Sequence, residues 1–292
     1  MLARGADHQS PDSGALSQQG GGRHLAVPLS PRQHAADLDA FQAAAGILPP
    51  PPGAGRARLK SSGTSQPPGP VSAPDIRRIA ALFPGRWDSN YVASKLRTDP
   101  LYTALVENLR GSDLPLLDLG CGLGVLAFFL RAEGITVPIH GLDYDVRKIH
   151  SARRAVDTSG TIGVTFDHHD AREGLPDHHG NVSILDILQF FTPGQQEELL
   201  RLAASRVAPG GKLVIRSGLR DESLRFRITV AGDLLAKATF WMKAAPTHYP
   251  TAGDFQRILS PFGDVSISPL WGGTPFNNHL VVLSCSARPA SP

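Results

Sequence analysis

The chain has 292 residues, with 29 Lys and Arg against 26 Asp and Glu, 41% hydrophobic residues and two cysteines. Two cysteines exclude a disulfide scaffold or a multi-cysteine zinc module and favour a reducing compartment. No apolar run approaches the 18 residues of a membrane span, and a net charge of +3 is too small to indicate nucleic-acid binding. We therefore expect a cytoplasmic protein with no membrane span and no nucleic-acid partner.

Residues 1–74 differ in composition from the remainder of the chain. They hold 11 of the 25 prolines and 10 of the 30 glycines but a single aromatic residue, Phe41. Because so little apolar surface cannot offset the entropy of ordering the chain, we predict a disordered segment. A transit peptide and an over-extended translation start are alternative origins for it. We expect the chemistry in residues 75–292, which are numerous enough for one α/β domain.

The globular part begins with helical patterns. Apolar residues from Ile76 to Phe83 have helix-face spacing, and further helices are predicted over 91–97 and 100–109, the latter with Asp99 as N-cap and Pro100 at the first helical position. Strands and helices then alternate. Strands are expected over 114–119, 138–142, 164–166, 182–188 and 212–215, with helices over 125–133, 146–156 and 193–207. The last helix has a start signal that resembles a capping box, formed by Thr192 and Gln195. This alternation predicts a parallel sheet covered by helices.

The pattern changes after the fifth strand. Residues 221–243 are largely helical, and Thr251 with Asp254 has the spacing of a capping box that opens another helix. Two strands, over 265–270 and 279–283, are joined by a Gly- and Asn-containing loop. We therefore expect an antiparallel hairpin at the end of the domain.

A glycine-rich turn follows the first strand. Gly120, Gly122 and Gly124 let the backbone approach a ligand closely, and the next helix N-terminus favours a carboxylate or phosphate. The dinucleotide fingerprint is one residue longer, so this compact loop with Asp118 suits a ligand with a positively charged end, such as S-adenosylmethionine (SAM). Asp143, at the end of the second strand, can accept hydrogen bonds from a ribose, which would fit NAD equally well.

Several motifs in order carry a family resemblance. They are Asp118-x-Gly-x-Gly-x-Gly124, Asp143, Asp170-Ala171 after the third strand, and Pro209-Gly-Gly-Lys-Leu-Val before the fifth. Over about residues 85–285 the chain resembles the class I SAM-dependent methyltransferases. The resemblance implies an α/β, Rossmann-like, seven-stranded and mostly parallel sheet with an antiparallel C-terminal hairpin and helices on both faces. SAM is the implied cofactor, with no metal.

The resemblance also implies roles for the matched residues. Gly120 and Gly122 would carry the methionine end of SAM, with Asp118 near its ammonium and Asp143 at its ribose. The other implied cofactor-binding positions lie nearby: Gly124 and Cys121 in the loop, Leu142 and Tyr144 beside the adenine, Asp170 and Ala171 at its amino group and ring, and Leu188 and Gln189 at the end of the fourth strand. We interpret Cys121 as a small buried residue and not a nucleophile.

An upstream helix offers further contacts. Trp87, Tyr91 and Lys95 are spaced i, i+4, i+8 on one face. In many members of the family such a helix lies over the cofactor, so we expect Tyr91 and Lys95 to touch the carboxylate or sulfonium region of SAM. The alternative is a core-facing Trp and Tyr with a surface Lys.

Residues 216–250 are the expected acceptor cap. The segment combines a basic rim, which includes Arg216 and Arg225, with aromatic bulk that includes Trp241. This composition fits an aromatic or acyl acceptor, free or linked to an acyl carrier protein, although an amphipathic helix with a solvated basic face would show it too. His248, then Tyr249, is the candidate base. Three further stretches are Arg216-Ser-Gly-Leu-Arg, Phe240-Trp-Met-Lys-Ala-Ala-Pro and Trp271-Gly-Gly-Thr-Pro-Phe-Asn-Asn. They resemble bacterial methyltransferases of aryl-polyene and related fatty-acid-like pathways, and this resemblance implies an acceptor of secondary metabolism.

Two other functions and one metal site are alternatives for this sequence. A Rossmann-type NAD(P)-dependent oxidoreductase is disfavoured by the glycine spacing, and a non-catalytic SAM-binding regulatory protein remains open. His168, His169 and Asp170 could suggest a metal site, but no further ligand cluster has a matching spacing.

Overall fold

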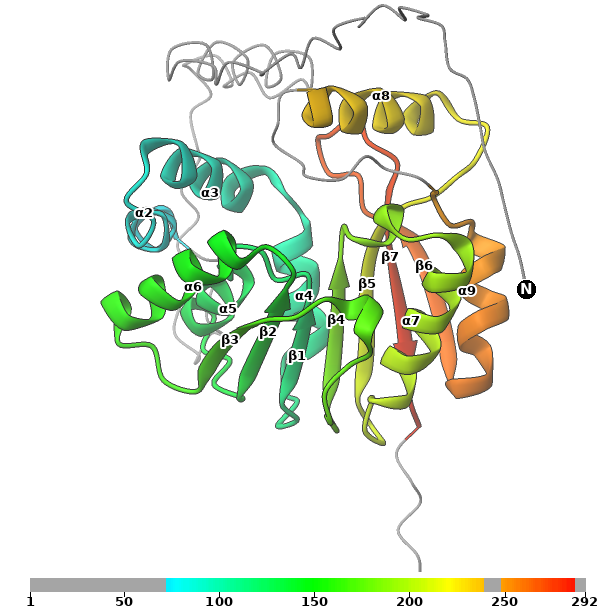
Figure 1. Ribbon diagram of the computed structural model, residues 1–292, viewed down its shortest axis with the longest axis horizontal. Coiled ribbons are helices and arrows are strands. Elements are labelled where there is room, and N and C mark those ends of the chain that lie inside the picture. Colours follow the sequence, from blue (N-terminus) through cyan, green and yellow to red (C-terminus); the bar gives the residue numbers. More distant parts are fainter. Residues whose placement is uncertain (1–71, 239–247, 287–292) are drawn as a thin grey trace, which may run out of the picture.

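The computed structural model describes residues 72–238 and 248–286, with backbone alone over 233–238. Its strands form one seven-stranded sheet in the order β3-β2-β1-β4-β5-β7-β6 (Figure 1). The strands are β1 (Leu116–Leu119), β2 (Ile139–Asp143), β3 (Val164–His168), β4 (Asn181–Leu185), β5 (Lys212–Gly218), β6 (Asp264–Pro269) and β7 (Asn278–Ser284). The first five strands are parallel, and β7 runs antiparallel between β5 and β6. The predicted fold class is therefore confirmed.

Helices cover both faces of this sheet (Figure 1). The helices are α2 (Ala73–Ala81), α3 (Arg86–Thr98), α4 (Leu101–Leu109), α5 (Val125–Ala132), α6 (Val146–Ser159), α7 (Pro193–Ser205), α8 (Leu224–Ala238) and α9 (Ala252–Leu259). One apolar cluster joins α2, α4, α5 and α6 to one face, and a second joins α7 and α9 to the other. Figure 1 shows α3 and α8 beyond the carboxyl ends of the parallel strands.

Strand β1 packs against apolar clusters on both faces of the sheet. Side chains alternate along β1, so Leu116 enters the first cluster while Leu117 and Leu119 enter the second. All four residues of β1 are buried. An apolar run in a central parallel strand is thus explained by helices on both sides.

Helix caps agree with their sequence signals. Thr192 with Gln195 and Thr251 with Asp254 form capping boxes at the starts of α7 and α9, as predicted. A third capping box, which the sequence analysis missed, joins Ser72 to Asp75 at the start of α2. Residues 73 and 74, which the sequence analysis placed in the disordered segment, therefore belong to α2. Residues 1–71, on which the rest of the disorder prediction falls, lie outside the described part.

The predicted ends of β4 and β5 are wrong. Strand β4 stops at Leu185, and Leu188 and Gln189 lie in the short 3₁₀ helix η2 (Leu188–Phe190) that follows. Strand β5 continues to Gly218, because β7 pairs with it along its whole length. Arg216 is consequently a strand residue, and the segment that follows the sheet begins after Gly218. Residues 239–247, including Trp241, lie outside the described residues.

Candidate cofactor and active site

The glycine loop begins where β1 ends, at the switch point of the sheet. Strand β1 pairs with β2 on one side and β4 on the other, and ligands of open α/β sheets bind at such a point. The N–H groups of Gly120 and Cys121 donate to the Leu142 carbonyl at 2.8 and 3.0 Å. The N–H of Gly122 donates to Asp143 Oδ2 at 2.9 Å. The loop is therefore anchored on the end of β2.

The three loop glycines have different surroundings. A Cβ on Gly120 would lie 2.4 Å from Ile187 Cγ2, and one on Gly124 would lie 2.3 Å from the Phe166 ring. A Cβ on Gly122 would meet nothing within 4 Å, although its φ of 57° also favours glycine. Gly120 and Gly124 thus allow close packing, while open space above Gly122 leaves its backbone accessible to a ligand.

Asp118 is a buried carboxylate directly before this loop. Within the described residues its hydrogen bond is from the Ser183 hydroxyl, at 2.7 Å. Burial raises the pKa of Asp118 to about 6; the Ser183 hydrogen bond opposes the shift and the charge of Asp143 adds to it. At neutral pH a poorly solvated negative charge therefore stands at the loop, where an ammonium group would be stabilised.

Asp143 is the last residue of β2 and is also buried. Its Oδ1 accepts from the Asp145 N–H at 2.7 Å, while its Oδ2 accepts from Gly122. Each carboxylate oxygen has two lone pairs, so one acceptor site on each oxygen remains for a ligand hydroxyl. The backbone bonds fix the carboxylate in place beside the glycine loop.

The expected adenine residues gather at the ends of β2 and β3. Leu142 is buried, whereas Tyr144 is 40% exposed. Asp170 caps the 3₁₀ helix η1 (Ala171–Glu173) and forms an ion pair with Arg172 at 2.9 Å. Partial desolvation raises the pKa of Asp170, but the hydrogen bonds from Arg172 and the positive charge of Arg172 outweigh desolvation and hold this pKa below its usual range. Ala171 follows in the same turn.

The two histidines before Asp170 have backbone partners. The Nε2 atoms of His168 and His169 lie 3.0 and 2.8 Å from the carbonyls of Tyr144 and Gly174. In residues 72–238 and 248–286, no group of three or more His, Cys, Asp or Glu side chains could hold a metal ion. Burial raises the pKa of the Cys121 thiol, which argues against a nucleophilic role.

Helix α3 brings the upstream residues to the same edge of the sheet. The Trp87 and Tyr91 rings stack with centroids 5.9 Å apart, and Lys95 Nζ lies 3.4 Å from the Tyr91 hydroxyl. Lys95 Nζ is also 3.9 Å from Asp186 Oδ2. Burial opposes the charge of Lys95, but the neighbouring Tyr91, Tyr102 and Asp186 outweigh burial and raise its pKa. Lys95 is therefore an ammonium at neutral pH.

Sequence reasoning missed the ion pairs beside Lys95. Arg216, expected on an exposed basic rim, is 5% exposed and pairs with both Asp186 and Asp99. The prediction of Arg216 as a rim residue is wrong because β5 extends through it into the buried sheet. No local signal could have revealed these pairs, since the partners lie 30 and 117 residues away along the chain.

The two candidate bases follow the segment that is not described. The N–H of His248 donates to the Gln189 carbonyl at 3.4 Å, and the His248 carbonyl accepts from Gln196 Nε2 at 3.0 Å. The imidazole is exposed. Tyr249 packs edge-on against Phe226 of α8, with ring centroids 5.2 Å apart. The fold thus brings His248 beside η2, close to the turn after β4.

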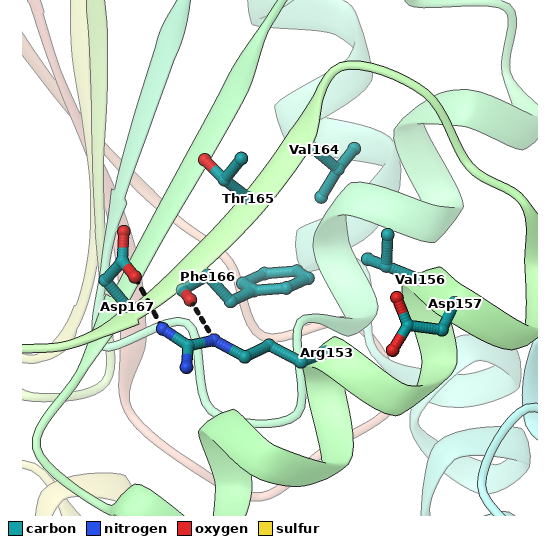
Figure 2. A pocket seen from close by; sticks show the side chains of 7 residues that line it. All are labelled: Arg153, Val156, Asp157, Val164, Thr165, Phe166 and Asp167. Atoms are coloured by element: carbon teal, nitrogen blue, oxygen red, sulfur yellow. Dashed lines mark hydrogen bonds and ion pairs between the residues drawn. The ribbon is translucent and has the colours of Figure 1, made fainter.

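A separate surface depression of about 260 Å³ lies between α6 and the edge strand β3. Figure 2 shows Arg153 reaching across it to the Phe166 carbonyl and the Asp167 carboxylate. None of its lining residues belongs to the glycine loop or to β1. We therefore distinguish this depression from the cofactor site.

A family model described as a methyltransferase domain matches residues 110–261, just over half of the chain. The chain belongs to this methyltransferase-domain family. The match spans β1, the glycine loop, Asp143 and α9, so the candidate cofactor residues from Asp118 onward and both candidate bases lie within the matched part, whereas α3 with Tyr91 and Lys95 precedes it. No protein of curated function matches the chain in sequence.

Solved structures share the fold of this methyltransferase domain. The pyocyanin biosynthetic protein PhzM has a TM-score of 0.51 and 19% identity, covering 73% of this chain and 62% of that one. Mitomycin 7-O-methyltransferase MmcR has a TM-score of 0.52 and 18% identity, covering 71% and 60%. A putative O-methyltransferase from Nostoc punctiforme has a TM-score of 0.52 and 16% identity, covering 72% and 69%. The chain spans less than two thirds of the length of the first two, and at these identities the likeness concerns the fold.

Proposed function

We propose that the protein transfers the methyl group of SAM to a small-molecule acceptor of secondary metabolism, an aromatic or acyl compound that is free or linked to an acyl carrier protein. The observation that carries the cofactor assignment is the pair of buried carboxylates, Asp118 and Asp143, at the ends of adjacent strands around the accessible backbone of Gly122. This donor and acceptor set matches a ligand that has an ammonium group, a ribose and no pyrophosphate.

The residues fit SAM by charge and by space. The space above Gly122 would take the methionine end, with its ammonium near Asp118. The remaining lone pairs of Asp143 would accept from the ribose hydroxyls. Leu142 and Tyr144 would flank the adenine, and Asp170 and Ala171 would meet its polar edge. When bound, SAM supplies an electrophilic methyl group on a sulfonium.

The chain then contributes positioning and proton transfer. Methyl transfer is an in-line displacement, so rate depends on holding the acceptor atom behind the methyl group. Tyr91 and Lys95 would bind a negatively charged group, because the Lys95 ammonium has one hydrogen bond within the described residues. His248 would remove the acceptor proton, because its backbone is held beside η2 while its imidazole is exposed.

Calorimetry with S-adenosylhomocysteine (SAH), the demethylated product, tests the cofactor assignment. Loss of the Asp143 carboxylate in Asp143→Ala should weaken SAH binding by about 2–3 kcal/mol, or roughly 30- to 150-fold. Asp143→Asn keeps one acceptor oxygen and should fall between. Asp157→Ala, an exposed carboxylate on α6, is the control. The assignment is falsified if Asp143→Ala binds SAH within twofold of wild type.

Two further measurements separate the rival functions. Binding of NAD in preference to SAH would indicate an oxidoreductase. A labelled-methyl assay over phenolic, carboxylic and acyl-carrier-linked acceptors tests turnover, and SAH binding without any transfer would favour a regulatory protein.

The same assay tests His248 as the base. Where methyl transfer occurs, His248→Ala should lower its rate about 100-fold at neutral pH and less at high pH. Unchanged turnover at every pH would contradict the base assignment.

A further inference from the structure

Arg216 is the buried centre of an ion cluster, and the proposed chemistry does not use Arg216 directly. Its Nε donates to Asp186 Oδ1 at 2.7 Å, and its Nη2 pairs with the other oxygen of the same carboxylate. Its Nη1 lies 2.6 Å from both oxygens of Asp99. With Lys95 near Asp186, two cations face two carboxylates. The Arg216 side chain is 6% exposed, so it is not available to an acceptor.

The first arm of this cluster fixes an unusual backbone. Asp186 has a φ of 59°, and among the described residues it is the non-glycine residue with positive φ. Such a conformation is costly for most side chains and persists where the surroundings hold it. The bidentate contact with Arg216 supplies that restraint. Ile187 follows at once and lies directly against Gly120, where it would contact any added Cβ.

The second arm holds the joint between two helices. Asp99 ends α3, and its carboxylate accepts from the Leu101 N–H at the start of α4, at 3.0 Å. The same carboxylate binds Arg216, so β5 restrains the end of the helix that carries Tyr91 and Lys95. One guanidinium therefore connects the turn after β4, the α3–α4 joint and the sheet.

We propose that Arg216 is a positioning residue for the cofactor: through Asp186 it presses Ile187 against Gly120, and through Asp99 it holds α3 over the same edge of the sheet. The inference rests on the proposed function, because the positioned ligand is the cofactor. Arg216 acts through these carboxylates and does not touch the ligand. A merely structural ion cluster would affect folding and leave the affinity of the folded protein for SAH unchanged.

Three sets of substitutions test the role. Arg216→Lys keeps the cation but cannot bind both carboxylates as a planar fork. Asp186→Asn keeps the shape and the tolerance of positive φ but weakens the pair. The triple variant Arg216→Met, Asp99→Asn, Asp186→Asn removes Arg216 together with both of its carboxylate partners and leaves the Lys95 ammonium, and replacing all partners of a buried ion pair preserves stability better than removing one. Arg201→Met, which breaks a half-buried pair with Glu197 on α7, is the control.

SAH binding by calorimetry and amide exchange of residues 187–190 and 120–122 are measured below the melting temperature. Arg216→Lys and the triple variant should melt cooperatively, weaken SAH binding at least tenfold and exchange faster in both segments. Arg201→Met should stay within twofold of wild type. The proposal is overturned if Arg216→Lys or the triple variant melts cooperatively and binds SAH with wild-type affinity. It is also overturned if none of the variants folds. If the wild type itself does not bind SAH, the proposed function fails, and the exchange rates alone decide the role of Arg216.

Discussion

At the scale of single residues, Asp118 is a carboxyl whose burial moves its titration toward neutral pH. Its pKa of about 6 means that the carboxyl becomes protonated between pH 7 and 5. SAH affinity should therefore fall about tenfold over that interval, since only the ionised form attracts the ligand's ammonium. By linkage, the raised pKa makes the unliganded fold lose stability as pH rises from about 4 to 6, and the bound ammonium offsets the loss. Calorimetry from pH 5 to 8 checks this. Asp118→Asn should bind weakly at all pH values, and an unaltered slope in that variant would assign the titration to another group.

At the scale of elements, Gln196 connects α7 to two segments near the site. Its Nε2 lies 2.8 and 3.2 Å from the carbonyls of Leu188 and Phe191 around η2, and 3.0 Å from that of His248. Gln196→Leu keeps the size but removes the side-chain donor that these three carbonyls share, so the free energy of unfolding should fall by about 1–3 kcal/mol. Urea denaturation measures the change. Gln256→Leu removes an exposed hydrogen bond of 3.3 Å and should cost less than about 0.5 kcal/mol. Equal effects of the two substitutions would show that η2 does not depend on Gln196.

At the scale of the whole molecule, the domain that begins at Ser72 contains the sheet, both apolar clusters and the candidate cofactor residues. No described helix is long and apolar enough to cross a bilayer. Deleting residues 1–70 should leave the melting temperature and SAH affinity unchanged, because that segment has little apolar surface to bury and the Ser72 cap of α2 is retained. Thermal melting and calorimetry of the truncated protein check the expectation. A loss of several degrees would show that the segment packs on the domain.

Local spacing in the sequence determined most of the fold. Alternating apolar runs and helix-face patterns predicted the parallel strands and their helices, since a strand buried on both faces is largely apolar. Thr192 and Thr251 predicted the starts of two helices, because a capping box is a contact between residues three apart in the sequence. The order of Asp118, the three glycines and Asp143 indicated a cofactor loop, since strand ends meet at one edge of a parallel sheet.

Only the tertiary structure decided the surroundings of that loop. The sequence predicted Arg216 to be an exposed cation, because its partners Asp99 and Asp186 are distant along the chain. The end of β4 was misjudged because an apolar 3₁₀ turn and an apolar strand have the same composition when both are buried. Likewise, Ile187 at Gly120 and Phe166 at Gly124 give the glycines a packing role that spacing alone does not reveal. Each of these contacts depends on how distant segments pack, so no local pattern specifies it.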